Sequence, residues 1–469
     1  MKKVRLLMVV LLLIFGLLLV ACGGGDEPAA EEPAAEEAEA PAEEAEAPAE
    51  EAEAPAEEME EMEDVTLRVL TWQNPPMVEF MEGFIEQFES NHPNITVDYS
   101  VVNANDLATI QQTRLTANDV DVIAGFGFAN GAQPYMSEVE PPNWQQFIQA
   151  GLLMDLTGQP FVDNYDEATI QDAGTFDGKV YQINLGRVTY SGMFYNKDLF
   201  AEYGVEVPTT WDELVAACET FSENNVSCMT AGGADGWPIF VGAYGLLGSL
   251  YPDQAALVEG LWTGEIKWDD PETVELWEKY QIYAQELLEP GTSGISGDAA
   301  PGRFSAGDVA MYPIGNWSAE AIESAEPDFE WGYAPFPGSD NADDNQYLFG
   351  KYDMGWMVNA NTPNEDAALL FLEEFSDPAN YQDFVNAVGF IPTQPGATLE
   401  TQIGQEVAPY LENFRVGFEQ YWVAPKGAGQ WANGSQGASW FQPFNEWDDA
   451  AALAAQAQAD LQAGLDTLE

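Results

Sequence analysis

Patterns typical of β-strands and α-helices alternate along the chain from residue 65 onwards. Residues 65–72 combine β-branched side chains with a period of two, and apolar residues at helical spacing follow within 80–88. The same alternation continues with a strand pattern over 95–101, a helix pattern over 106–117 and a short apolar strand over 120–123. This order predicts an α/β fold, with a parallel sheet covered by helices and ligands held beyond the carboxyl ends of the strands.

The chain has 469 residues, more than one hydrophobic core usually serves, so two lobes are expected. The stretch 176–214 combines a strand, a short helix, a proline-containing loop and a helix capped by Thr210, which suggests a crossing from one lobe to the next. The predicted domain limits are a first lobe of 65–188 plus 335–381, and a second of 189–334 plus 382–469.

The N-terminus has the features of an export signal. Three basic residues precede an apolar run over 6–20, which is too short to span a membrane comfortably. A small residue, Ala21, then precedes Cys22 and three glycines, which resembles a bacterial lipobox. We therefore predict a lipoprotein signal peptide over 1–21, with Cys22 lipidated and the protein held outside the cell membrane or in the periplasm. The alternative is an ordinary signal peptide in which this cysteine is incidental.

A segment of Glu, Ala and Pro follows the signal. Residues 26–64 contain 19 acidic residues, no basic residue and three copies of EEAEAPA, a composition that cannot bury a core. We predict that 22–64 form an extended, disordered tether. Without the tether and the signal, 61 acidic and 11 basic residues remain, a formal charge near −50 that argues against nucleic acid as a partner. A salty or acidic habitat would explain this acidity equally well.

Two cysteines besides Cys22 lie in the predicted body. Cys218 falls near the end of a predicted helix and Cys228 at the start of the next strand. In an exported protein two such thiols are expected to pair rather than stay free.

Aromatic and polar side chains recur directly after the predicted strands. Aromatic faces beside amides and carboxylates suit a neutral polyol, whose C–H face stacks on the ring. The alternative for each ring is core packing, which is favoured for Trp211, Trp262 and Trp277. The candidates are Trp72, Asn74, Phe126, Phe128, Asp235, Trp237, Trp317 and Tyr352.

Catalytic and cofactor chemistry find little support in the sequence. With 61 acidic residues in the body, a carboxylate pair of glycosidase type is expected by chance. One histidine, His92, excludes an ordinary metal cluster, and no phosphate loop or nucleophile elbow is present. We predict no enzyme activity and no cofactor. Asp121 and Asp308 are expected to be structural, and Lys351 either donates to a ligand or, more simply, forms a salt bridge.

The segments GKVYQINLG and MFYNKDLFAEYGVEVPTTWDEL, supported by FIEQFESNHPNITVDY and FSAGDVAMYPIGNW, carry a resemblance to a known family. The chain resembles the maltose-binding-protein-like extracellular solute-binding proteins, family 1, over roughly 65–468. The resemblance implies a two-lobed periplasmic-binding-protein-like fold of type II, with the ligand in a cleft between lobes joined by hinge crossings. It also implies an ABC importer whose transmembrane subunits receive the ligand from a monomeric binding protein.

Carried over by position, the resemblance supports the candidates above as ligand contacts, with Trp317 as a stacking platform. It adds Tyr190, Lys351, Trp422 and Trp440. The expected ligand is a carbohydrate, such as an oligosaccharide or another neutral sugar. Three alternatives stay open: a cationic solute such as a polyamine, a secreted carbohydrate-active enzyme, and a scaffold or adhesion lipoprotein.

Overall fold

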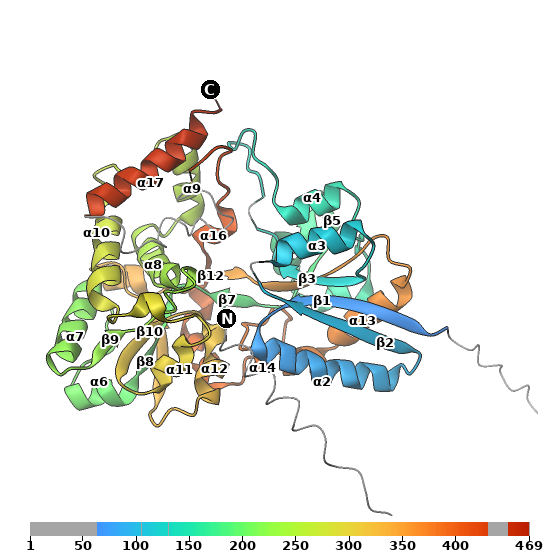
Figure 1. The fold of residues 1–469 in the computed structure, drawn as a ribbon, viewed down its shortest axis with the longest axis horizontal. Helices are drawn as coiled ribbons and strands as arrows, with labels where there is room; N and C mark the ends of the chain where they lie inside the picture. Colours follow the sequence, from blue (N-terminus) through green and yellow to red (C-terminus); the bar gives the residue numbers. More distant parts are fainter. Residues whose placement is uncertain (1–62, 105, 130, 430–448, 469) are drawn as a thin grey trace, which may run out of the picture. The chain divides into compact units, whose positions relative to one another are not determined.

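The computed structural model describes residues 63–104, 106–129, 131–429 and 449–468. These described residues all belong to one compact unit (Figure 1). The predicted signal peptide, the lipidation site Cys22, nearly all of the predicted tether, and Trp440 lie outside the described residues.

The strands alternate with helices, as the sequence predicts, and form separate sheets. The strands are β1 (Val65–Trp72), β2 (Ile95–Val102), β3 (Val122–Phe126), β4 (Thr175–Phe176), β5 (Lys179–Val180), β6 (Ile183–Asn184), β7 (Arg187–Thr189), β8 (Gly192–Asn196), β9 (Ser227–Met229), β10 (Val309–Pro313), β11 (Trp331–Pro335), β12 (Phe349–Tyr352), β13 (Met354–Val358) and β14 (Arg415–Val416). The α-helices are α2 (Pro75–Asn91), α3 (Leu107–Thr116), α4 (Asn143–Gln149), α5 (Glu167–Ala173), α6 (Lys197–Tyr203), α7 (Trp211–Glu223), α8 (Trp237–Leu250), α9 (Gln254–Thr263), α10 (Val274–Ile282), α11 (Ala300–Ser305), α12 (Ala319–Ser324), α13 (Glu365–Phe375), α14 (Pro378–Val388), α15 (Gln402–Val407), α16 (Phe418–Tyr421) and α17 (Ala450–Leu465). Single turns of 3₁₀ or π-helix are η1 (Pro160–Asn164), η2 (Tyr283–Leu287), η3 (Thr292–Gly294), η4 (Asn316–Ser318), η5 (Ala342–Asn345) and η6 (Ala408–Asn413).

The first sheet has the strand order β2-β1-β3-β13-β6. β1 is parallel to β2 and β3, whereas β13 is antiparallel to β3 and β6. The predicted parallel pairing is therefore present among β1, β2 and β3, and β13 makes the sheet mixed. A parallel neighbour requires a crossover connection, and β13 instead enters directly from β12, with only Asp353 between them.

Both faces of the first sheet are buried. Along β3, Val122 and Ala124 belong to the main core, while Ile123 between them belongs to a second, smaller core. Because successive strand residues point to opposite faces, helices are needed on both sides. Helices α2, α13 and α14 pack together beside one face, and α3 and α4 lie together beside the other (Figure 1).

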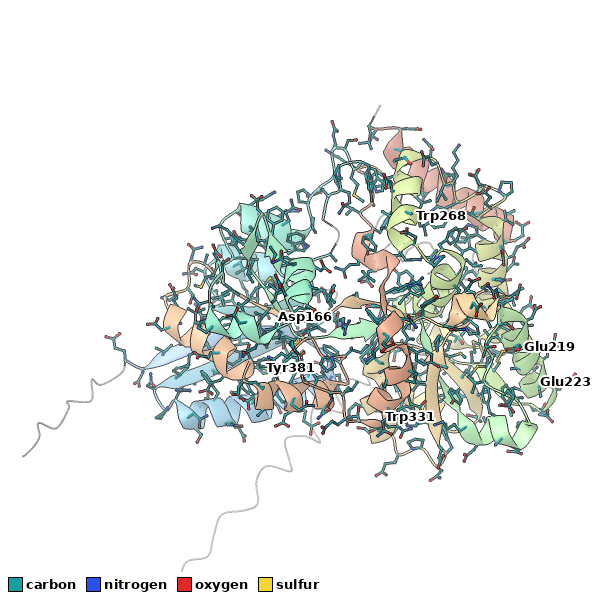
Figure 2. All side chains as sticks on the ribbon, turned by 180° about the vertical axis from the view of Figure 1, so that it is seen from behind. Asp166, Glu219, Glu223, Trp268, Trp331 and Tyr381 are labelled. Carbon is teal, nitrogen blue, oxygen red and sulfur yellow. A yellow bond between two sulfur atoms is a disulfide. The ribbon has the colours of Figure 1, made fainter. Side chains whose placement is uncertain are left out.

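The second sheet has the order β11-β8-β10-β9 and is also mixed, since only the pair β10–β9 is parallel. Helix α8 packs against β8 and is buried almost all round. It begins at Trp237, with Pro238 in its first turn, a position to which proline is well suited. Trp331 on β11 and Trp268, which donates its backbone N–H to Gln458 of α17, are labelled in Figure 2.

Two short strands carry the chain between these sheets. β7 lies between β6 of the first sheet and β8 of the second, and β12 lies between β11 and β13. β7 and β12 pair antiparallel, and β14 pairs with β12 on its other side. The predicted limit at 188 falls within β7, the limit at 335 at the end of β11, and the limit at 381 inside α14, where Tyr381 donates a hydrogen bond to Leu185 O (2.8 Å; Figure 2). The lobe limits remain a prediction.

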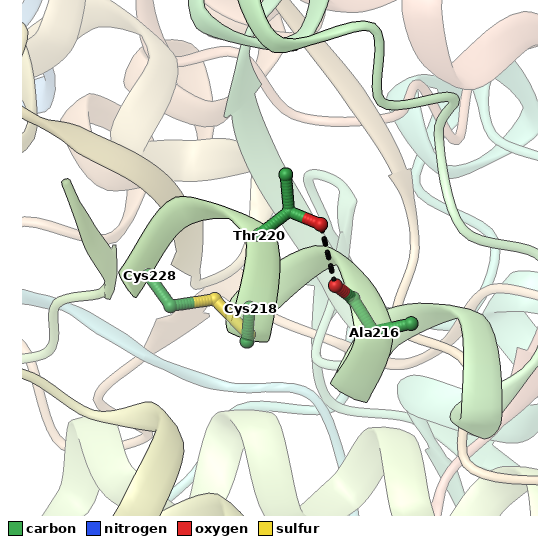
Figure 3. The surroundings of a disulfide bond; sticks show 4 residues. All are labelled: Ala216, Cys218, Thr220 and Cys228. Carbon is green, nitrogen blue, oxygen red and sulfur yellow. Dashed lines mark hydrogen bonds between the residues drawn. A yellow bond between two sulfur atoms is a disulfide. The ribbon is translucent and has the colours of Figure 1, made fainter. Parts of the chain in front are cut away.

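The predicted disulfide between Cys218 and Cys228 is present and joins α7 to β9 (Figure 3). In the same helix, the Thr220 hydroxyl donates to the Ala216 carbonyl oxygen, which lies one turn earlier (2.9 Å). Both cysteines are buried. The bridge therefore fixes the helix that the sequence capped at Thr210 against the second sheet.

Replacing both cysteines with alanine should lower the free energy of unfolding by about 2–3 kcal/mol, the chain-entropy value for closing a loop of this length. Urea denaturation of both forms, with and without reductant, measures this. Reductant should destabilise the wild type and leave the double variant unchanged. Equal stability of the oxidised wild type and the variant would contradict the prediction.

Candidate ligand-binding site

Six of the predicted ligand-binding side chains contact one another in series, although they come from two strands of the first sheet, from β12 and from segments next to the strands of the second sheet. We call this series the aromatic strip. Its members, in order of contact, are Trp72, Phe126, Lys351, Tyr190, Trp317 and Trp237.

One half of the strip lies at the first sheet. Trp72 ends β1 and Phe126 ends β3, and their ring centroids are 4.9 Å apart. The two strands are parallel neighbours, so their carboxyl ends meet at one edge of the sheet, as the sequence predicts. Phe126 is 36% exposed and is the only large apolar side chain exposed among the described residues. An exposed ring at a strand end is available for stacking.

The other half lies at the second sheet. Trp317 follows β10 and its ring lies 5.1 Å from Tyr190 and 6.3 Å from Trp237, the first residue of α8. Trp317 and Trp237 are partly exposed, whereas Tyr190 is buried. The Trp317 and Trp237 rings are therefore partly accessible to a ligand, while the Tyr190 ring packs beneath the surface.

The loop that carries Trp317 is tied to β7. The Asn316 side-chain oxygen accepts a hydrogen bond from the Thr189 backbone N–H (2.8 Å), and its amide donates to Gly389 O. A Cβ on Gly315 would lie 1.7 Å from the Trp317 ring, so only glycine allows the ring to lie this close. The position of Trp317 is thus coupled to a strand that joins the two sheets.

Lys351, on β12, lies at the centre of the strip and is only 5% exposed. Its ammonium lies 4.3 Å from the Phe126 ring centre and 5.2 Å from that of Tyr190, which gives cation–π contacts. It also forms ion pairs with Asp353 (3.3 Å) and Glu419 (3.2 Å). Of the two uses that the sequence left open for Lys351, the salt bridge is present.

The electrostatics of this cluster follow from burial and pairing. Burial lowers the pKa of the Lys351 ammonium, but the charges of Glu419, Tyr190 and Asp353 outweigh burial and hold that pKa well above its ordinary value. Burial raises the pKa of the Glu419 carboxyl, against the opposing effect of Lys351. Lys351 therefore stays charged at neutral pH and depends on its two carboxylates.

Several predicted residues have structural contacts outside the strip. Asn74 caps α2 by accepting from Met77 N–H (3.3 Å), and Phe128 stacks on Trp144 in the second core (4.3 Å). The Tyr352 hydroxyl donates to Asp172 (3.3 Å). For these three residues the structure shows local packing or capping.

Two further residues predicted to bind the ligand, Asp235 and Trp422, have different surroundings from each other. Asp235 is exposed, accepts from Gly297 N–H (2.5 Å) and lies near Trp237, which places it at the end of the strip. Trp422 is completely buried and stacks on Phe418 (5.3 Å), so its ring has no exposed face. Trp422 thus lies in the core of this structure, and its contact with a ligand stays a prediction.

Other expectations concerned structural residues. Asp121 accepts from the backbone (2.7 Å) and guanidinium (2.8 Å) of Arg68, and Asp308 pairs with Arg303, which confirms both as structural. The three tryptophans expected in the core, Trp211, Trp262 and Trp277, are buried.

The sequence reasoning missed Glu419, Asp353 and Tyr244. Glu419 lies on α16, 68 residues from Lys351 along the chain, and no local pattern connects the two. Tyr244, one helix turn beyond Phe240 on α8, contacts Tyr190 edge-on (5.8 Å). Asp353 lies two residues from Lys351, which is a signal that could have been used.

Neither a metal centre nor a membrane span is found within the described ranges. No group of three or more His, Cys, Asp or Glu side chains there could hold a metal ion. No helix in that part of the chain is long and apolar enough to cross a membrane.

Comparison with known proteins places this geometry in context. A family model described as bacterial extracellular solute-binding protein matches residues 74–382. An uncharacterised ABC transporter extracellular-binding protein of Pyrococcus horikoshii is 28% identical over 285 residues, which cover 59% of this chain and 62% of that protein. The chain thus spans less than two thirds of that relative. The multiple sugar-binding protein of Streptococcus mutans is 24% identical over 328 residues, covering 68% of this chain and 72% of that protein.

Solved structures share the fold. RafE of Streptococcus pneumoniae, in complex with raffinose, has a TM-score of 0.67 at 22% identity, covering 84% of this chain and 98% of that one. A chitin oligosaccharide binding protein has a TM-score of 0.67 at 20% identity, covering 86% and 99%. The predicted two-lobed α/β fold is confirmed.

Proposed function

Since the chain belongs to the bacterial extracellular solute-binding protein family, we propose that it captures a neutral carbohydrate on the aromatic strip and delivers it to the membrane subunits of an ABC importer. The strip itself carries the proposal. Exposed or half-exposed rings of Phe126, Trp317 and Trp237 suit the C–H faces of sugar rings, and Asp235 beside Trp237 suits hydroxyl groups.

Relatives support the same class of ligand. The solved structures of similar fold include one with raffinose and one described as binding chitin oligosaccharide, and a relative is named a multiple sugar-binding protein. In this proposal the ligand contacts both halves of the strip, so it stabilises the arrangement in which they lie together. The strands β7 and β12, which join the sheets, would then be the hinge.

Delivery requires the protein to stay near its importer. We propose that Cys22 is lipidated after removal of residues 1–21 and that the acidic segment 22–64 tethers a monomeric body at the outer face of the membrane. Mass spectrometry of the membrane-extracted protein would detect a diacylglyceryl group on Cys22. Full release of Cys22→Ala into the soluble fraction is expected.

A cationic solute is the second candidate, since the body carries a formal charge near −50. The contacts of Lys351 argue against it. Its ammonium already occupies the cation–π positions at Phe126 and Tyr190, so a second cation would have to displace it there. A neutral ligand meets no such penalty.

A thermal-shift screen of the full chain separates the candidates. A neutral oligosaccharide at 100 times its dissociation constant should raise the unfolding free energy by about 2.7 kcal/mol. A polyamine panel and an amino-acid panel serve as controls. Stabilisation by spermidine but by no sugar would contradict the carbohydrate proposal, and release of shortened sugars during incubation would indicate an enzyme instead.

A further inference from the structure

An open cavity of about 500 Å³ lies outside the aromatic strip. It is lined by the segment that enters α9, by both residues of β14 and by the last residue of α16. Helices α9 and α16 contact each other beside it, as Figure 1 shows. Its volume is enough for a monosaccharide-sized ligand.

Arg415 on β14 lines this cavity. Its guanidinium lies 3.6 Å from the Tyr347 ring centre and 5.9 Å from that of Phe349, a stacked position. Within the described residues, no carboxylate lies within 4.0 Å of this guanidinium, and its side chain has no hydrogen-bond partner there. Arg187, Lys267 and Lys426 likewise form no salt bridge within the described residues, and Arg415 differs from these three in lining the cavity.

Most of the other basic residues of the body form ion pairs, unlike Arg415. In the described part of the chain, seven of the 11 basic residues of the body do form ion pairs, and they are Arg68, Arg114, Lys179, Lys197, Lys279, Arg303 and Lys351. A stacked guanidinium keeps its in-plane N–H groups directed outward, and these match a carboxylate with two parallel hydrogen bonds.

The rest of the cavity wall adds hydroxyl-binding and apolar groups. Asp253 caps α9 with one oxygen, which accepts from Ala256 N–H (3.0 Å), and its carboxylate does not pair with Arg415. Tyr421 and Pro252 present a ring and an apolar edge. A ligand that matches these lining residues carries a carboxylate that pairs with Arg415, hydroxyl groups that donate to Asp253 and a C–H face that packs on Tyr421.

We propose that this cavity binds a uronic acid, a sugar whose carboxylate pairs with Arg415, independently of the neutral-sugar site proposed above. A phosphate ester fits less well, because its second negative charge would face Asp253 with a single basic residue to balance it. A cation is excluded by Arg415 itself. The expected ligand is therefore an acidic monosaccharide, or an acidic sugar unit within a longer carbohydrate.

Isothermal titration of the full chain with D-glucuronate, D-glucose and acetate tests the proposal. We expect glucuronate to bind at least about ten-fold more tightly than glucose or acetate, and more weakly at high salt. Arg415→Gln should weaken glucuronate binding about ten-fold or more. Arg415→Lys should weaken it by less, because lysine keeps the positive charge but lacks the two parallel N–H donors of the guanidinium. Asp253→Asn retains the cap and should strengthen binding a few-fold by removing a like charge.

The controls separate this site from the first one. Lys426→Gln removes the same charge at an exposed position and should leave glucuronate binding unchanged. Trp317→Ala should leave it unchanged too, while Arg415→Gln should leave neutral-oligosaccharide binding unchanged. A further titration with digalacturonate distinguishes binding of a free acidic monosaccharide from binding of an acidic sugar unit within a longer carbohydrate. Glucuronate bound no more tightly than glucose, or equally by Arg415→Gln and wild type, would overturn the proposal.

Discussion

Trp317→Ala should weaken binding of a neutral oligosaccharide by about 30-fold, or about 2 kcal/mol, because a single aromatic anchor can carry a large share of the binding energy. Trp317 contacts both Tyr190 and Trp237, so its loss breaks the strip within its second-sheet half. Calorimetric titration with the sugar found in the thermal screen measures the change.

Stability provides the control for this variant. Trp317 is partly exposed, so its replacement should shift the unfolding midpoint only slightly. Trp144→Ala removes an equally half-buried indole that stacks on Phe128 in the second core, and sugar affinity should then change by less than about three-fold. Unchanged affinity in Trp317→Ala would mean that this ring only packs between the two sheets.

Lys351→Met should lower the free energy of unfolding by about 3–5 kcal/mol, the usual cost of removing one partner from a buried ion pair. Lys351 is 5% exposed and Glu419 6% exposed, so the two carboxylates it pairs with would be left without a cation in a poorly solvated place. Methionine keeps most of the side-chain volume, so the loss reports charge rather than packing. Urea unfolding at pH 7 measures it.

Three comparisons sharpen that experiment. Lys179→Met breaks an exposed pair with Asp155 (2.7 Å; Lys179 is 55% exposed) and should cost less than about 1 kcal/mol. The double variant Lys351→Met with Glu419→Gln should recover part of the loss. Burial already raises the pKa of Glu419, so the deficit of Lys351→Met should shrink as the pH falls and Glu419 takes up a proton. A deficit that is absent at pH 7 would contradict the assignment.

Lys351 on β12 contacts Phe126 from the first sheet and Tyr190 beside the second. A ligand that stacks on the strip therefore touches side chains positioned by the strands that join the sheets. In our proposal this contact transmits ligand binding to the relative arrangement of the lobes.

Local patterns were sufficient for many elements of the fold. The strand over 65–72, the helix over Lys197–Tyr203 and the helix capped by Thr210 are confirmed, because periodicity and capping act between residues close in sequence. The Cys218–Cys228 bridge also spans a separation of only 10 residues. No local pattern indicates the direction of β13, since that direction depends on where the chain comes from and not on the residues of the strand.

The sequence by itself determined which rings follow strands, and the parallel pairing of β1 with β3 was enough to bring Trp72 to Phe126. Only the tertiary structure decided that Lys351 joins those rings to Tyr190 and Trp317, that Glu419 neutralises it, and that Trp422 is covered. It likewise left Arg415 stacked beside a cavity and unpaired within the described residues. Each of these depends on contacts between distant segments, whose charges and surfaces meet only once the chain is folded.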